Sequence, residues 1–212
     1  MNKLVVAPFD LHAKLLQLIA RETENAKRGL PARIIAKFNS LVEPQLIEAL
    51  YAASAAGVKI DLIIRGICCL RPGVAGLSEN ISVRSIVDRF LEHSRIYYFE
   101  NALQAEVFVG SADLMPRNLF RRIEILFPIE DGNLCDRVIS EILRVTLADN
   151  TKARLLDGDG VYHPAKIPAG KPRRRSQTDF MRLALPPAAA TAAEKFPRVE
   201  LAPGPFPKRS KK

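Results

Sequence analysis

Short apolar runs alternate with amphipathic stretches along residues 3–165, and this order predicts an α/β fold. Asp10 and Pro44 are typical first residues of helices, while Gly57 is typical of a helix end. The first expected elements are a strand at 3–8, a helix at 10–28, a strand at 32–38, a helix at 45–56 and a strand at 59–65. Because such helices are long enough for crossovers, we expect parallel pairing of the strands that they connect.

The alternation continues after a loop at 67–80 that is rich in glycine and proline. The further expected elements are strands at 81–86, 96–99, 105–109, 121–128 and 152–156, a short helix at 87–92 and a long helix at 131–150. In the strand at 121–128 the pattern puts Arg122 and Glu124 on the face opposite Ile123 and Ile125. The long helix has an apolar side formed by Leu134, Val138, Ile142 and Val145.

The composition changes at residue 166. Residues 166–212 are rich in proline, alanine and basic side chains, so we expect them to form a disordered tail. The formal net charge of +9 lies in this tail, because acidic and basic residues are equally numerous in 1–165. The chain is therefore predicted to consist of a folded domain at 1–165 and a tail at 166–212. The balanced charge of the folded part argues against nucleic acid as its partner.

The cysteines and the apolar runs predict the compartment. Cys68, Cys69 and Cys135 have neither the spacing of metal ligands nor that of a disulfide framework, which indicates reduced thiols. The N-terminal apolar run is too short for a signal peptide, and no apolar run approaches the length of a membrane span. We therefore expect a cytoplasmic protein without a membrane span.

Polar side chains end two strands that are expected to be neighbours. Lys37 and Asn39 lie at the end of the strand at 32–38, and Arg65 ends the strand at 59–65. Ligands of open α/β sheets bind at the carboxyl ends of the strands, and cationic side chains there are typical phosphate contacts. The alternative is that Lys37 and Arg65 are ordinary charges at the rim of a sheet.

A histidine precedes the strand at 96–99. His93 follows the expected helix at 87–92, and Arg95 lies two residues later. A histidine at the mouth of a strand can exchange protons or meet a phosphoryl group near neutral pH, and arginine can hold phosphate oxygens. The alternative is a histidine that only complements the dipole of a helix end.

Several segments of the folded part occur together, in this order, in one known family. They are Lys37-Phe38-Asn39-Ser40-Leu41, Leu50-Tyr51-Ala52-Ala53-Ser54, Ile64-Arg65-Gly66-Ile67-Cys68, Gly76-Leu77-Ser78-Glu79-Asn80-Ile81, Arg89-Phe90-Leu91-Glu92-His93-Ser94-Arg95 and Ser111-Ala112-Asp113-Leu114-Met115-Pro116-Arg117-Asn118. With these segments, residues 3–165 resemble the C-terminal domain of bacterial polyphosphate kinase. This is a phospholipase D-like domain, so the resemblance implies a mixed sheet flanked by helices.

The resemblance also implies site residues and a substrate. Arg65 matches an arginine that contacts the nucleotide phosphates, and Arg122 matches an arginine that lines the phosphate tunnel. His93 matches the second active-site histidine, which is among the ATP contacts and is proposed to assist proton transfer. The motif positions held by Lys37, Asn39 and Arg117 imply further ATP or phosphate contacts. ATP and polyphosphate are therefore the expected ligands.

Parts of the family's enzyme have no counterpart in this sequence. The N-terminal domain, the head domain and the first phospholipase D-like domain are absent, and His12 and His163 lack the neighbours of the histidine that becomes phosphorylated. Mg²⁺ is expected for the full enzyme, but the arginines that bind it belong to the missing domain, so no metal ligand is expected here. Two smaller departures are Gly110, where the family usually has serine, and Leu114, where it usually has tryptophan.

Three functions remain open at this point. The first is the C-terminal domain of a polyphosphate kinase, acting in reversible transfer of the terminal phosphate of ATP to polyphosphate when a separate chain supplies the missing lobe. Homo-oligomers are also expected for this fold. The second is a catalytically inactive fragment that binds polyphosphate or nucleotide. The third is a phospholipase D-type hydrolase, whose signature requires lysine at position 95 and aspartate at position 100, where this chain has Arg95 and Glu100.

Overall fold

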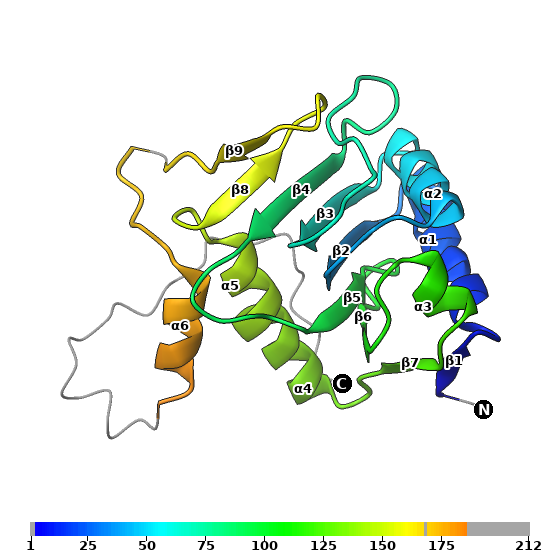
Figure 1. Cartoon of the computed structure of the whole chain (residues 1–212). Coiled ribbons are helices and arrows are strands. Elements are labelled where there is room, and N and C mark those ends of the chain that lie inside the picture. Colours follow the sequence, from blue (N-terminus) through cyan, green and yellow to red (C-terminus); the bar gives the residue numbers. More distant parts are fainter. Residues whose placement is uncertain (1–2, 168, 186–212) are drawn as a thin grey trace.

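The computed structural model of the chain describes residues 3–167 and 169–185, which form one mixed sheet with helices on both faces (Figure 1). The strands are β1 (Val5–Ala7), β2 (Arg33–Phe38), β3 (Lys59–Ile64), β4 (Ile81–Ile86), β5 (Arg95–Phe99), β6 (Glu106–Gly110), β7 (Glu124–Pro128), β8 (Ala153–Leu156) and β9 (Tyr162–Pro164). The helices are α1 (Leu11–Lys27), α2 (Pro44–Ala55), α3 (Pro116–Phe120), α4 (Gly132–Arg137), α5 (Arg144–Leu147) and α6 (Ser176–Leu183). A π-helical segment, η1 (Val138–Leu143), joins α4 to α5.

Parallel strands form the centre of the sheet. The strand order is β1-β7-β6-β5-β2-β3-β4-β8-β9, and β3 runs parallel to both β2 and β4. All other pairs, including β5 with β2, are antiparallel. The predicted mixed α/β sheet is therefore confirmed. Because β2 and β3 are parallel neighbours, their carboxyl ends lie side by side, next to the start of the antiparallel β5.

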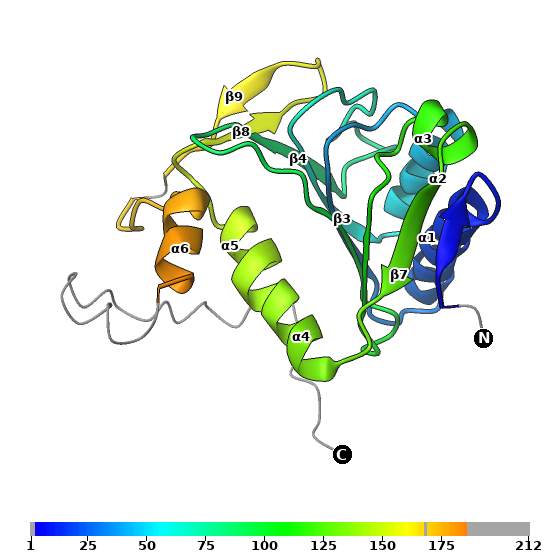
Figure 2. The ribbon, with the colours of Figure 1, turned by 60° about the horizontal axis from the view of Figure 1, so that its bottom comes forward.

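Helices cover the two faces of the sheet unequally. In Figure 2 the sheet lies between α1 and α2 on one side and the α4–α5 helix on the other. Ile34 and Phe38 of β2 belong to the larger core under α1 and α2, while Ile35 belongs to the core under α4 to α5. The long helix predicted at 131–150 is thus present, but its buried stripe differs from the prediction. The buried residues of this helix are Cys135, Ile139, Leu143 and Thr146, whereas Leu134 is 50% exposed.

The predicted helix at 87–92 is wrong, because the structure has an irregular loop there. In a helix the N–H groups of residues 87–94 would bond to carbonyl groups of the same segment. This loop is instead held by side chains from a distant part of the chain. The amide N–H of Phe90 donates to Oε1 of Gln177 (2.8 Å), and both carboxylate oxygens of Asp88 accept from Arg175 (2.6 and 2.7 Å). Local periodicity cannot reveal such long-range partners.

The predicted alternation along β7 is confirmed, because Glu124 lies on the face opposite Ile125, and the apolar pair of Ile123 and Ile125 is on the side that faces solvent. Ile123 is 84% exposed and Ile125 is 37% exposed, while Leu126 is buried in the core under α1. Glu124 is half-buried on the face that α1 covers. Its carboxylate accepts a hydrogen bond from Asn118 Nδ2 at 2.7 Å, so the charged group has a partner there. The helix under the other face packs mainly on β5 and β6, which leaves the apolar side of β7 open to solvent.

The predicted tail contains ordered structure where it is described. Helix α6 lies in this segment, beside α5 (Figure 2), so the expected disorder is wrong for 176–183. Ser176 is fully buried and hydrogen-bonds to Asp149, a long-range contact that composition cannot predict. The rest of that prediction, for 168 and 186–212, lies outside the described residues. Within the described part of the chain, no helix has the length and apolar character needed to cross a membrane.

Candidate functional site

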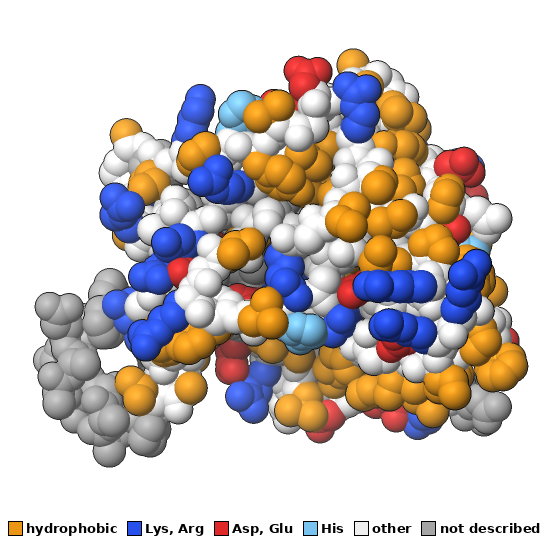
Figure 3. Space-filling view, in the orientation of Figure 1, with side chains coloured by type: hydrophobic (Ala, Val, Ile, Leu, Met, Phe, Trp, Pro, Cys, Tyr) orange, Lys and Arg blue, Asp and Glu red, His pale blue; other side chains and the backbone are white. Residues whose placement is uncertain are grey.

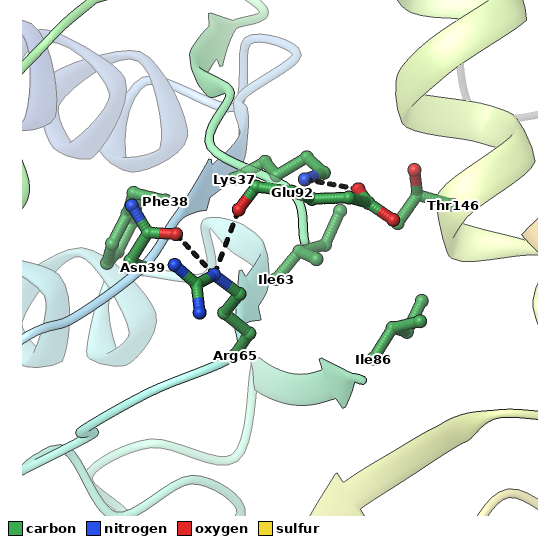
Figure 4. Close-up of a pocket in the computed structure, with 8 residues that line it drawn as sticks. All are labelled: Lys37, Phe38, Asn39, Ile63, Arg65, Ile86, Glu92 and Thr146. Carbon is green, nitrogen blue, oxygen red and sulfur yellow. Dashed lines mark hydrogen bonds and ion pairs between the residues drawn. The ribbon is translucent and has the colours of Figure 1, made fainter. Parts of the chain in front are cut away.

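The carboxyl ends of β2 and β3 meet in a pocket, as the sequence predicted. Lys37 and Asn39 from the end of β2 line it together with Arg65, which follows β3 (Figure 4). Glu92 from the loop at 87–94 and Thr146 from α5 complete its polar lining. The parallel pairing of β2 with β3 places these side chains together, because both strands end at the same edge.

Asn39 holds Arg65 in place. The Asn39 side-chain Oδ1 accepts a hydrogen bond from Arg65 Nε at 2.6 Å, and the backbone carbonyl of Glu92 accepts a second one from the same Nε at 2.9 Å (Figure 4). Asn39 is in turn fixed by Asp113, whose Oδ1 accepts from the Asn39 backbone N–H (2.8 Å) and side-chain Nδ2 (2.9 Å). Asn39 is therefore a positioning residue whose hydrogen-bonding groups are already used inside the protein.

His93 lies between two guanidinium groups. Its Nε2 is 3.5 Å from Arg65 Nη2, and its Nδ1 is 3.4 Å from Arg95 Nη1. Arg95 also donates to the backbone carbonyl of His93 at 2.6 Å, which fixes the residue that carries the ring. The imidazole is exposed, so a ligand can reach it from solvent. An anion beside this ring would meet two arginines, each able to donate several hydrogen bonds.

Asp113 is the counterion of Arg95. The Arg95 guanidinium donates to both carboxylate oxygens of Asp113, at 3.1 and 3.2 Å, and Asp113 is 8% exposed. Burial raises the pKa of Asp113, but hydrogen bonds from Arg95 and Asn39 outweigh burial and hold the pKa below its usual range. Asp113 therefore stays ionised near neutral pH and links the end of β2 to the start of β5.

Lys37 has a partner within the site. Its ammonium group lies 2.7 Å from Oε2 of Glu92, and the lysine is only 6% exposed (Figure 4). Its charge is thus balanced by a carboxylate of the His93 loop. Sequence reasoning missed Glu92 and Asp113, although both lie inside the segments that carry the family resemblance.

The structure leaves Arg117 and Arg122 outside the pocket. Arg117 is an exposed residue of α3, and Arg122 is exposed just before β7. Figure 3 shows Lys and Arg side chains gathered over α3, the helix that contains Arg117. The contact of Arg117 and Arg122 with phosphate stays a prediction.

The described residues do not fit a magnesium site. Hard cations such as Mg²⁺ prefer carboxylate oxygens, but Glu92 is paired with Lys37 and Asp113 with Arg95. No group of three or more His, Cys, Asp or Glu side chains suited to a metal occurs in residues 3–167 and 169–185.

The fold is that of a phospholipase D-like domain. The chain is similar in fold to the phospholipase D family member Nuc from Salmonella typhimurium, with a TM-score of 0.53 and 16% identity over 73% of this chain and 96% of that one. In this chain His93 lies before the first residue of β5, and Glu100 follows its last residue. The carboxylate of Glu100 accepts a hydrogen bond from the hydroxyl of Tyr98 (2.7 Å).

The chain belongs to the family described as polyphosphate kinase C-terminal domain 2, whose model matches residues 4–177. It is 57% identical to a polyphosphate kinase from Neisseria meningitidis serogroup B over 86% of the chain, and 54% identical to one from Burkholderia ambifaria over 85%. Its structure matches the crystal structure of polyphosphate kinase from Porphyromonas gingivalis with a TM-score of 0.82 and 41% identity, covering 86% of this chain and 28% of that one. The chain spans about a quarter of the length of these relatives.

Proposed function

We propose that this chain is the ATP- and polyphosphate-binding half of a polyphosphate kinase active site. In this proposal it takes part in the reversible transfer of the terminal phosphate of ATP to polyphosphate. The observation that carries the proposal is the exposed His93 ring, with Arg65 Nη2 and Arg95 Nη1 within 3.5 Å of its two nitrogens. Membership of the polyphosphate kinase family supports the choice of substrates.

The chemistry of phosphoryl transfer suits this arrangement. The reaction depends on positioning and on neutralising the charge of the phosphate oxygens more than on covalent steps. Arg65 and Arg95 would hold those oxygens, and Asn39 and Asp113 keep both guanidinium groups oriented. His93 would hold or pass a proton at a ring nitrogen, since an imidazole nitrogen can accept or donate a proton.

Other parts of the proposal concern what the chain works with. We propose that a separate chain supplies the lobe that carries the phosphohistidine, and that the complete enzyme uses Mg²⁺ held by that lobe. Arg117 and Arg122 are proposed to guide polyphosphate over the surface near α3, because both are exposed cations in or just after this helix. The cytoplasmic location and the homo-oligomer stay predictions.

A transfer assay tests the proposed function. The purified chain is incubated with γ-labelled ATP and polyphosphate, alone and mixed with a polyphosphate kinase fragment that carries the missing lobe. We expect no transfer by the chain alone and transfer after mixing. Transfer by the chain alone would contradict the half-site, because another residue would then act as nucleophile. Absence of transfer in both would favour the inactive binding fragment.

Binding of tripolyphosphate tests whether Arg65 belongs to the site. We expect Arg65→Ala to weaken binding at least about 10-fold, because a charge-assisted hydrogen bond contributes about 1.5–3 kcal/mol. Arg137→Ala is the matched control, since Arg137 is an exposed arginine that pairs with Glu141 on the same helical stretch. Equal affinity of the Arg65 variant and the control would remove Arg65 from the site.

A further inference from the structure

Helix α6 is anchored to the body of the domain at its first residue. The backbone N–H and the hydroxyl of Ser176 both donate to Oδ2 of Asp149, at 2.7 and 2.9 Å. Asn150 adds two contacts with the segment before the helix, since its Oδ1 accepts from the N–H of Arg174 (2.7 Å) and its Nδ2 donates to the carbonyl of Pro172 (3.0 Å). The start of α6 is therefore fixed at the end of α5 independently of the His93 loop.

The same end of α6 contacts the loop at 87–94. The Gln177 side chain accepts from the Phe90 N–H (2.8 Å) and donates back to the Phe90 carbonyl (2.8 Å), so one amide satisfies both backbone groups of one loop residue. Its Nε2 also donates to Oε1 of Glu92 at 2.9 Å. Gln177 is 4% exposed, which protects these hydrogen bonds from competition by water. Arg175 and Asp88 add an ion pair two residues earlier in each segment.

These contacts continue directly into the candidate site. Glu92 receives Gln177 on one carboxylate oxygen and Lys37 on the other, so its side chain is held from α6 and from β2. The carbonyl of Glu92 accepts from Arg65 Nε, and the next residue is His93. A displacement of Glu92 would therefore move the backbone acceptor of Arg65 and the histidine together.

We infer that Gln177 is a positioning residue of the polyphosphate kinase site, and that α6 is the support that sets where the His93 loop lies. This inference rests on the proposed function, because it concerns the same site. Gln177 touches no reacting group; it acts through Phe90 and Glu92. The loop has no regular secondary structure, so the partners on α6 take the place of the internal hydrogen bonds that would otherwise hold it.

The test compares Gln177→Ala and Gln177→Glu in the full chain. The alanine variant removes all three hydrogen bonds, whereas the glutamate variant keeps the size of the side chain and the bond from the Phe90 N–H. Glutamate loses both donated bonds, however, and places a second carboxylate beside Glu92. Met181→Ala is the control, because Met181 lies on the same helix and is 41% exposed.

The first readout is the imidazole spectrum, which needs no ligand. The chain has three histidines, so in a heteronuclear NMR spectrum His12 and His163 serve as internal references for His93. We expect both Gln177 variants to shift the His93 ring signals and to leave the other two unchanged. We also expect the Phe90 amide to exchange with solvent about 10-fold faster in the alanine variant, as the loss of a protecting hydrogen bond requires. The Met181 variant should match the unmodified chain in both measurements.

The second readout is the affinity for tripolyphosphate, which we expect to fall about 3- to 10-fold in both variants without loss of the folded state. Unchanged His93 signals, or unchanged affinity despite a faster Phe90 amide, would overturn the positioning role. If the unmodified chain does not bind tripolyphosphate, the proposed function fails. The His93 signals then still decide whether Gln177 positions the loop, so the two failures are distinguishable.

Discussion

Asp113 offers the sharpest test of how the site is held together. The substitution Asp113→Asn keeps the size of the side chain but removes its charge. In the structure the carboxylate accepts two hydrogen bonds from Asn39 and two from Arg95. An asparagine can keep Oδ1 as an acceptor for Asn39, but its amino group would face Arg95 Nη2, donor against donor. The variant would also leave the Arg95 guanidinium without its counterion.

The contacts set the size of the expected effect. Breaking a fully buried ion pair costs about 3–5 kcal/mol, and a hydrogen bond to a charged group contributes about 1.5–3 kcal/mol. The side chains of Arg95 and Asp113 are 16% and 11% exposed, so water can replace part of the hydrogen bonding that the substitution removes. We therefore expect Asp113→Asn to lower the free energy of unfolding by about 2–3 kcal/mol at pH 7.

Urea unfolding of the full chain measures this free energy. Glu141→Gln is the matched control, because it makes the same change from acid to amide in an exposed pair with Arg137, where we expect a loss of at most about 0.5 kcal/mol. A loss for Asp113→Asn no greater than that of the control would refute the reasoning. It would mean that Arg95 finds an equivalent partner, and that Asp113 does not hold the two strand ends together.

Two further predictions concern stability. Hydrogen bonds, chiefly from Ser176, outweigh the effect of burial and hold the pKa of Asp149 below its usual range, as those from Arg95 and Asn39 do for Asp113. The stability that the ionised Asp149 and Asp113 contribute is therefore present above the unfolded pKa of about 4. It is lost as the pH falls through the lower pKa of the folded state. Urea unfolding against pH should show this fall, and Asp149→Asn should flatten it; a variant with an unchanged slope would contradict the assignment. For Gly110→Ser, an added Cβ would lie 2.5 Å from the carbonyl oxygen of Ile125, so β7 must move. We expect a loss of about 1–3 kcal/mol, seen as a lower Tm, and an unchanged Tm would show that β7 shifts freely.

The sequence alone predicted most of the sheet, for a physical reason. The elements from β1 to β5 have strong local signals, namely apolar runs bounded by residues such as Pro44 and Gly57. Helix–strand alternation predicts parallel pairing, which is right for β2 and β3 and brings their ends together, but is wrong for β1, which pairs antiparallel with β7 at the edge of the sheet. Lys37, Asn39 and Arg65 were therefore predictable as neighbours from the sequence alone.

Only the tertiary structure decided how these residues share their hydrogen bonds and charges. No periodicity in the sequence shows that Lys37 pairs with Glu92, or that Asp113 serves both Asn39 and Arg95. Each partner in these pairs lies on a different segment, and an ion pair across such distances in the chain leaves no local pattern.

The loop at 87–94 and helix α6 show the same division most clearly. The local sequence predicted a helix in the first and disorder in the second, yet the loop is irregular and α6 is a helix. Helix α6 is anchored by Asp149 and in turn holds the loop, because Gln177 bonds both backbone groups of Phe90 and Arg175 pairs with the side chain of Asp88. The sequence by itself determined the sheet and the residues at its edge, because those follow from local patterns. The tertiary structure decided the position of His93, because that depends on contacts between segments that are far apart in the chain.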